Sequence, residues 1–172
     1  MSQPRYPLKI NVGFLINQPI GTSRDIHFDF PSLSLTPDFE TIDFQGIVRI
    51  NRTPQGLLFQ GEFNAKESEQ CVRCLARFWQ PLHGAFEELY AFHPARNGGA
   101  YGRTVSESEL ILPEDANVDL APLVREILLL DVPISPLCRP DCKGLCPECG
   151  ADLNVAPCEH ALKRAESGSL NG

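Results

Sequence analysis

The chain has 172 residues, enough for one ordinary domain with its own core, and a net charge of −7 from 22 acidic and 15 basic residues. This charge argues against a protein whose whole surface binds nucleic acid, because counterion release rewards a dense array of Lys and Arg. No apolar run approaches the ~18 residues of a membrane span, and residues 1–30 contain no apolar core of a secretory signal. We therefore expect a cytoplasmic protein whose cysteines stay reduced.

The first ninety residues have the composition of β-strands. Strands are predicted in residues 9–16, 25–30, 41–51, 57–65 and 77–92, the last one long, bent and broken near Pro81 and Gly84. Residues 52–56, with the sequence RTPQG, have the composition of a hairpin turn. In residues 41–51 the alternation places Ile42, Phe44, Val48 and Ile50 on one face.

A polar segment and one clear helix follow. Residues 94–109 are expected to form a mobile loop, and their Gly-Gly-Ala-Tyr-Gly run does not match a phosphate-binding motif. Asp119 can cap a helix over residues 119–130, and Asp131 with the following Val-Pro ends it. Its apolar residues recur at helical spacing and are Leu120, Leu123, Val124, Ile127 and Leu128.

These elements predict an α+β fold. We expect mainly antiparallel β-sheet or a partly open barrel, with one packed helix at about 119–130 and a zinc-bound C-terminal segment. Residues 1–135 would form the β-rich core with the helix. Residues 136–162 would form the metal-binding segment, docked on the core through Cys71 and Cys74, and residues 163–172 a flexible tail.

Seven cysteines and a histidine carry the strongest chemical signal in the sequence. Their spacing is Cys-x2-Cys in residues 71–74, Cys-x3-Cys-x3-Cys-x2-Cys in residues 138–149, and Cys-x-His in residues 158–160. A Cys-x2-Cys turn presents two sulfurs to one metal ion, and zinc takes four such ligands in a tetrahedron. The pattern therefore favours zinc binding over a disulfide framework, with iron as the alternative metal in a site of four cysteines.

Eight ligands are enough for two complete zinc sites. We expect a first site of Cys71, Cys74, Cys138 and Cys142 and a second site of Cys146, Cys149, Cys158 and His160. The first would tie the sheet to the segment after the helix, and the second would be a compact local knuckle. A rival grouping joins the four cysteines of residues 138–149 and leaves the pair in residues 71–74 for another role.

Sites with four protein ligands are closed, so they stabilise a fold and leave no position open for catalysis. We therefore expect no enzymatic activity. The alternatives are a zinc hydrolase or a thiol oxidoreductase that uses the Cys71-x-x-Cys74 pair, where Arg73 would favour the thiolate. A redox pair of this spacing usually begins a helix after a strand, however, and both flanks here have strand composition.

Three blocks of sequence, CVRCL, DLAPLVREILLLDVPISPLC and CKGLCPECGADLN, resemble the YceD-like family of large ribosomal RNA subunit accumulation proteins of bacteria and plastids. The resemblance implies a non-enzymatic factor needed for accumulation of the large-subunit ribosomal RNA, through its synthesis, processing or stability. Some relatives lack the Cys146 and Cys149 block. This loss implies that the two sites are separable and that the first site is the more fundamental one in the family. The family often has Cys where this chain has His160, which also binds zinc.

The expected partner is a ribosomal protein or the large-subunit ribosomal RNA precursor, with no membrane and no small-molecule substrate. Four basic residues would gather near the first site and could hold phosphates, and they are Arg73, Arg77, Arg139 and Lys143. Trp79 or Phe78 could stack on an unpaired base. The charge of −7 instead favours contact with a basic ribosomal protein, so both routes stay open.

Overall fold

A computed structural model describes residues 7–93 and 110–168 of the chain. The loop predicted in residues 94–109 and the last four residues of the predicted tail lie outside the described residues. The chain divides into two compact units. We call residues 1–66 and 81–131 the sheet unit, and residues 67–80 and 132–172 the cysteine unit.

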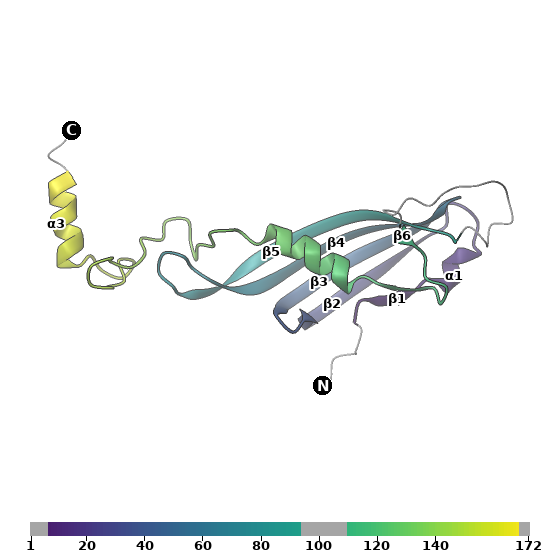
Figure 1. Cartoon of the computed structure of the whole chain (residues 1–172), viewed down its shortest axis with the longest axis horizontal. Coiled ribbons are helices and arrows are strands. Elements are labelled where there is room, and N and C mark those ends of the chain that lie inside the picture. Colours follow the sequence, from purple (N-terminus) through teal and green to yellow (C-terminus); the bar gives the residue numbers. More distant parts are fainter. Residues whose placement is uncertain (1–6, 94–109, 169–172) are drawn as a thin grey trace. The chain divides into compact units, whose positions relative to one another are not determined.

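Five strands form an open sheet whose order follows the sequence (Figure 1). They are β2 (Ser23–Thr36), β3 (Phe39–Arg52), β4 (Gly56–Gln70), β5 (Arg77–Ala91) and β6 (Leu110–Ile111). β2 pairs antiparallel with β3, whereas β5 pairs parallel with β6. A second sheet joins β1 (Lys9–Asn11) antiparallel to β7 (Asn117–Asp119). The described residues thus form mostly sheet, in open sheets and with no closed barrel.

Two strand predictions need correction. Residues 9–16 were expected to be one strand, but β1 ends at Asn11 and the short helix α1 (Gly13–Ile16) follows. An apolar run of this length cannot be assigned by periodicity alone. Oδ1 of Asn11 accepts the Gly13 N–H at 3.1 Å where the strand ends and the helix begins. The strand predicted in residues 77–92 was expected to be broken near Pro81 and Gly84, but β5 (Arg77–Ala91) is continuous through both.

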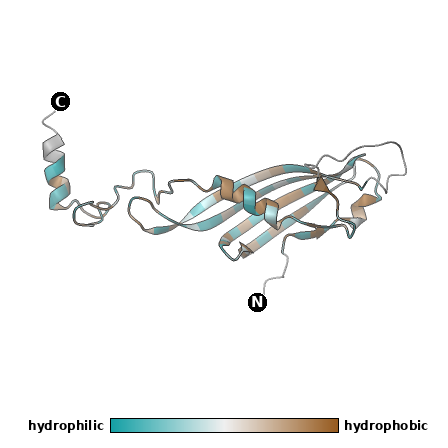
Figure 2. Cartoon of the chain, viewed as in Figure 1, coloured by the Kyte–Doolittle hydropathy of each residue, from teal (hydrophilic) through white to brown (hydrophobic). Residues whose placement is uncertain are grey.

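Aromatic side chains fill the core of the sheet unit. Phe44, Phe59 and Phe63 are fully buried, and the rings of Phe44 and Phe63 lie 5.5 Å apart between centroids. Gly46 leaves room for this packing, since a Cβ there would lie 2.1 Å from Cδ1 of Phe63. The strands alternate between hydrophobic and hydrophilic residues, as Figure 2 shows, because one face of the sheet is buried.

The predicted helix is present as α2 (Ala121–Asp131), which lies across one face of the sheet in Figure 1. Oδ1 of Asp119 accepts a hydrogen bond from the Ala121 N–H at 3.0 Å, so Asp119 caps the start of the helix as expected, from the position before Leu120. Val124 and Leu128 are buried, and the side chain of Ile127 occupies the space over Gly84, where a Cβ would lie 2.3 Å from its Cγ2. Among the described residues, no helix is long and apolar enough to span a membrane.

Candidate metal centres

The turn between β4 and β5 positions the first pair of cysteines. The Cys71 N–H donates to the carbonyl of Ala76, and the Leu75 N–H donates to the carbonyl of Cys71, both at 2.9 Å. These bonds fold the Cys-x2-Cys segment tightly enough to bring both sulfurs to one side. Leu75 adopts a left-handed conformation with φ of 60°, which is costly for a residue with a Cβ.

Residues 146–151 form a second turn with the same hydrogen bonds. The Cys146 N–H donates to the carbonyl of Ala151, and the Gly150 N–H donates to the carbonyl of Cys146, both at 2.8 Å. Gly150 takes the left-handed position with φ of 71°, where Leu75 stands in the first turn. Both Cys-x2-Cys segments therefore close the same hydrogen-bonded turn, which accounts for the equal spacing of the two cysteine pairs in the sequence.

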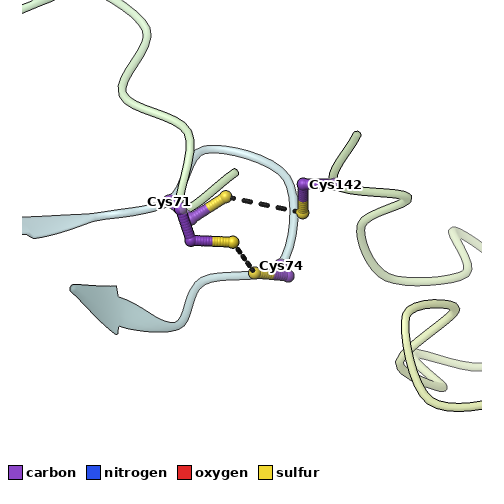
Figure 3. A group of neighbouring side chains, drawn as sticks. Cys71, Cys74 and Cys142 are labelled. Atoms are coloured by element: carbon purple, nitrogen blue, oxygen red, sulfur yellow. Dashed lines mark hydrogen bonds between the residues drawn. The ribbon is translucent and has the colours of Figure 1, made fainter. Parts of the chain in front are cut away.

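The first group brings together Cys71, Cys74, Cys138 and Cys142, with their four sulfurs within 4.8 Å of one another. The sulfurs of Cys71 and Cys142 lie 3.7 Å apart, and Figure 3 shows both with Cys74 beside them. The sulfurs of Cys74 and Cys138 lie 3.6 Å apart. Four sulfurs at about 2.3 Å from one zinc ion would lie roughly 3.8 Å apart in a tetrahedron. The separations exceed the ~2.05 Å of a disulfide, and all seven cysteines are free thiols.

Backbone contacts hold the two halves of this first group together. The Val72 N–H donates to the carbonyl of Pro136 at 3.0 Å, and the Leu145 N–H donates to the carbonyl of Arg73 at 3.0 Å. Nη1 of Arg73 donates to the carbonyl of Cys142 at 2.8 Å. Gly144, with φ of 75°, lies so close that a Cβ would be 2.9 Å from the Arg73 oxygen. The close fit requires glycine at this position.

The second group contains Cys146, Cys149, Cys158 and His160, again with one ligand atom from each within 4.8 Å of the others. Cys146 is buried, whereas Cys149 is exposed. Helix α3 (Glu159–Gly168) begins directly after Cys158 and carries His160 in its first turn. This helix includes residues 163–168, which the sequence analysis assigned to the tail.

In each group the backbone stabilises one cysteine as the thiolate, the form that binds a metal. Backbone N–H groups, first that of Cys138 and then those of Cys74 and Arg73, lower the pKa of Cys71 to about 6 against the opposing effect of burial. Backbone N–H groups of Cys149 and Glu148 likewise lower the pKa of Cys146 to about 6.

Two other thiols of the first group, Cys74 and Cys138, have a raised pKa. Burial, and then the side chain of Cys74, raise the pKa of Cys138 to about 12. The Ala76 N–H lowers the pKa of Cys74, but burial and the neighbouring thiols outweigh it and raise that pKa above its ordinary value. Close packing of several thiols has this effect, because ionisation of one disfavours ionisation of those beside it.

Sequence reasoning missed three side chains that contact the ligands. Nδ2 of Asn154 donates to the sulfur of Cys142 at 3.5 Å, while its Oδ1 accepts the Lys143 N–H at 2.8 Å. Nη2 of Arg164 donates to the sulfur of Cys146 at 3.5 Å. Glu148 lies 3.7 Å from Nε2 of His160, measured from Oε2. Hydrogen bonds such as those of Asn154 and Arg164 orient metal ligands and tune their basicity, whereas Glu148 lies beside His160 at an ion-pair distance.

The four basic residues proposed for partner contact are exposed and belong to the cysteine unit. Arg73 contacts Cys142, and the Arg139 carbonyl accepts the Cys142 N–H at 3.1 Å, so both border the first group. Lys143 follows Cys142 directly, whereas Arg77 lies at the start of β5. Trp79, two residues further along β5, is 52% exposed.

Comparison with known proteins identifies the relatives of this chain. The family described as Large ribosomal RNA subunit accumulation protein YceD matches residues 59–169. The chain belongs to the YceD family. The matched region of the YceD family includes all eight residues of the two groups.

Several curated proteins are similar to this YceD-family chain. An uncharacterised protein of Mycobacterium tuberculosis is 34% identical over 110 residues, which cover 64% of this chain and 51% of that protein. The chloroplastic large ribosomal RNA subunit accumulation protein YCED homolog 1 of Arabidopsis thaliana is 32% identical over 56 residues, covering 33% of this chain and 17% of that protein. The matches to the mycobacterial proteins thus span about half of their length. No solved structure matches the chain.

Proposed function

We propose that this protein is a non-enzymatic zinc-binding factor of ribosome biogenesis that supports accumulation of the large-subunit ribosomal RNA, through its synthesis, processing or stability. The observation that carries the proposal is the grouping of all seven cysteines and His160 into two four-ligand clusters inside the region matched by the YceD family. Membership of that family supports the link to ribosomal RNA, and the clusters support the cofactor.

Two features of the ligand groups fit zinc. The sulfur separations in the first group match the edge of a zinc–thiolate tetrahedron. In the second group, Nδ1 of His160 is buried and finds no hydrogen-bond partner among the described residues, as expected of an atom that binds a metal. A bound Zn²⁺ would neutralise thiolates and stabilise the turns around them.

The metal would have a structural role. Four protein ligands fill the coordination shell of zinc, so no position remains for a water molecule or a substrate. Both groups are complete within the described residues, and no cysteine of the chain is left over. The two zinc ions would therefore order the cysteine unit, in which residues 136–162 dock through Cys71 and Cys74.

The protein would act in the cytoplasm. Its proposed partner is the large-subunit ribosomal RNA precursor or a ribosomal protein. Arg73, Arg139 and Lys143 border the first metal group, and Arg77 with Trp79 lies in the adjoining strand. Such a set could hold phosphates and stack on a base. The net charge of −7 supports the ribosomal protein instead, because basic ribosomal proteins attract an acidic surface.

The decisive experiment measures ribosomal RNA in cells that lack this protein. We expect a reduced ratio of large- to small-subunit ribosomal RNA, restored by the parent chain and not by Cys71→Ser/Cys74→Ser. Ser68→Ala, in the strand before the first cysteine, provides a matched control that keeps every ligand. An unchanged ratio in the deficient cells would refute the role in accumulation.

One observation favours a thiol oxidoreductase as the second candidate function. The backbone N–H of Cys138, with those of Cys74 and Arg73, lowers the pKa of Cys71 to about 6, which is the property of a reactive thiol. Cys71 is fully buried, however, so a reagent reaches it poorly. Rapid alkylation of Cys71 in the metal-loaded protein would support the oxidoreductase, whereas protection of all thiols would support the zinc factor.

A further inference from the structure

Helix α3 meets the second cysteine turn through a short chain of polar contacts. Oε2 of Glu148 lies 3.7 Å from Nε2 of His160, and Oε1 of the same carboxylate lies 4.0 Å from Nε of Arg164. Nη2 of Arg164 donates to the sulfur of Cys146 at 3.5 Å. The carboxylate of Glu148, inside the Cys-x2-Cys turn, therefore faces two side chains of α3 at once.

The positions of the two α3 residues explain this arrangement. His160 and Arg164 are four residues apart on the helix, so their side chains project from the same face. The helix is fixed at its start by the Leu162 N–H, which donates to the carbonyl of Cys158 at 3.0 Å. Cys158 and His160 are themselves members of the second group. One face of α3 is thus directed at the sulfur ligands.

The two ring nitrogens of His160 have different surroundings. Nε2 faces the carboxylate of Glu148, whereas Nδ1 is buried and has no hydrogen-bond partner among the described residues. A buried ring nitrogen without a partner is rare unless a ligand satisfies it. At 3.7 Å the Glu148 carboxylate acts on Nε2 through its charge, which favours the proton on that nitrogen and leaves the lone pair of Nδ1 available to a metal.

We propose that Nδ1 of His160 is the metal-binding atom of the second group, that Glu148 is the positioning residue that holds the proton on Nε2, and that Arg164 supports Cys146 through its sulfur. This inference rests on the metal binding proposed above. Three thiolates and one Zn²⁺ leave a net negative charge, which the Arg164 guanidinium offsets at the most buried of the three sulfurs. Metal binding would thereby dock α3 on the turn.

The test compares Glu148→Ala with Glu148→Gln and Glu159→Gln. Glu159 is exposed and lies between Cys158 and His160, so its variant removes an equal charge beside the ligands without touching the contact to Nε2. We expect Glu148→Ala to weaken zinc binding at the second site by about 10- to 100-fold in chelator competition. Glu148→Gln retains an acceptor oxygen and should lose less zinc affinity than Glu148→Ala. The zinc affinity of Glu159→Gln should stay within about threefold of that of the parent.

The second readout is the protonation pattern of the imidazole. NMR of the ¹⁵N-histidine-labelled, zinc-loaded chain should show a protonated Nε2 and a metal-bound Nδ1 on His160. Metal bound to Nε2, or equal weakening in Glu148→Ala and Glu159→Gln, would overturn the inference and leave the proposed function intact. Native mass spectrometry tests whether the second group binds a metal at all. One metal ion in the parent that is lost in Cys71→Ser/Cys74→Ser would mean that the second group binds none, and this too would overturn the inference.

Discussion

Gly144→Ala should weaken metal binding at the first group, and the structure allows the effect to be sized. An alanine there keeps a left-handed φ of 75°, which costs roughly 1–2 kcal/mol for a residue with a Cβ. The new Cβ would lie 2.9 Å from the Arg73 carbonyl oxygen, which already accepts the Leu145 N–H at 3.0 Å. Weakening that hydrogen bond adds about 1 kcal/mol.

The sum of roughly 2–3 kcal/mol should appear as a loss of zinc affinity, because metal binding and ordering of the turn are one process. At about 1.4 kcal/mol per tenfold, zinc affinity of the first group should fall roughly 30- to 150-fold in chelator competition. Gly150→Ala is the matched control, since its φ of 71° is similar but no atom lies within 4 Å of its added Cβ.

The control should therefore show only the conformational part of the cost. We expect the Gly150→Ala affinity loss, at the second group, to be roughly 5- to 25-fold. The reasoning fails if Gly144→Ala binds zinc within about threefold of the parent, or if Gly150→Ala has the larger effect. Either result would mean that the contact between Gly144 and Arg73 does not limit formation of the first group.

Three further predictions concern stoichiometry, pH and the sheet unit. Cys71→Ser/Cys74→Ser should bind one zinc ion in native mass spectrometry where the parent binds two, and two ions in the variant would contradict the grouping. Burial, and then the Cys74 side chain, raise the pKa of Cys138 to about 12, so zinc must displace the proton of this thiol to bind. The zinc affinity measured by chelator competition should therefore rise with pH above 6, and a flat profile would refute this reasoning. Gly84→Ala should destabilise the sheet unit by about 1–3 kcal/mol by displacing Ile127, seen as a lower denaturation midpoint by circular dichroism; an unchanged midpoint would show that α2 shifts freely.

Strict alternation made the strands predictable, and departures from it marked where prediction failed. Phe44, Val48 and Ile50 are buried as the pattern of β3 predicted. Thr41 is buried as well, with its hydroxyl donating to the Leu33 carbonyl at 3.0 Å, while Ile42 is only half-buried. Asp43, with φ of 51°, interrupts the pleat between Ile42 and Phe44, so the buried positions change from odd to even numbers there. No sequence rule identifies which Asp of a strand will adopt a left-handed conformation, although Asp tolerates it better than most.

The grouping of the eight candidate ligands was predictable because it depends on counting and spacing, whereas the supporting contacts depend on geometry. The Cys-x2-Cys turns and the total of eight ligands led to the two groups that the structure brings together. Asn154, Glu148 and Arg164 are ordinary polar residues in sequence, and each reaches its ligand only through the folded turn. One signal was available: in EHALKRAESG, His160 and Arg164 have helical spacing, and recognising α3 would have placed both on one face.

The two groups differ in how much chain each one closes. The sulfurs of Cys74 and Cys138 meet across 64 residues of sequence, whereas the second group draws all its ligands from residues 146–160. A loop of 64 residues costs about 2 kcal/mol more to close than one of about ten. A zinc ion in the first group would therefore constrain the unfolded chain more strongly, and its loss would release residues 138–142 from the turn between β4 and β5. Loss of a second ion would release only α3 and its knuckle, and because Cys149 is exposed we expect that ion to be the first to leave under a chelator.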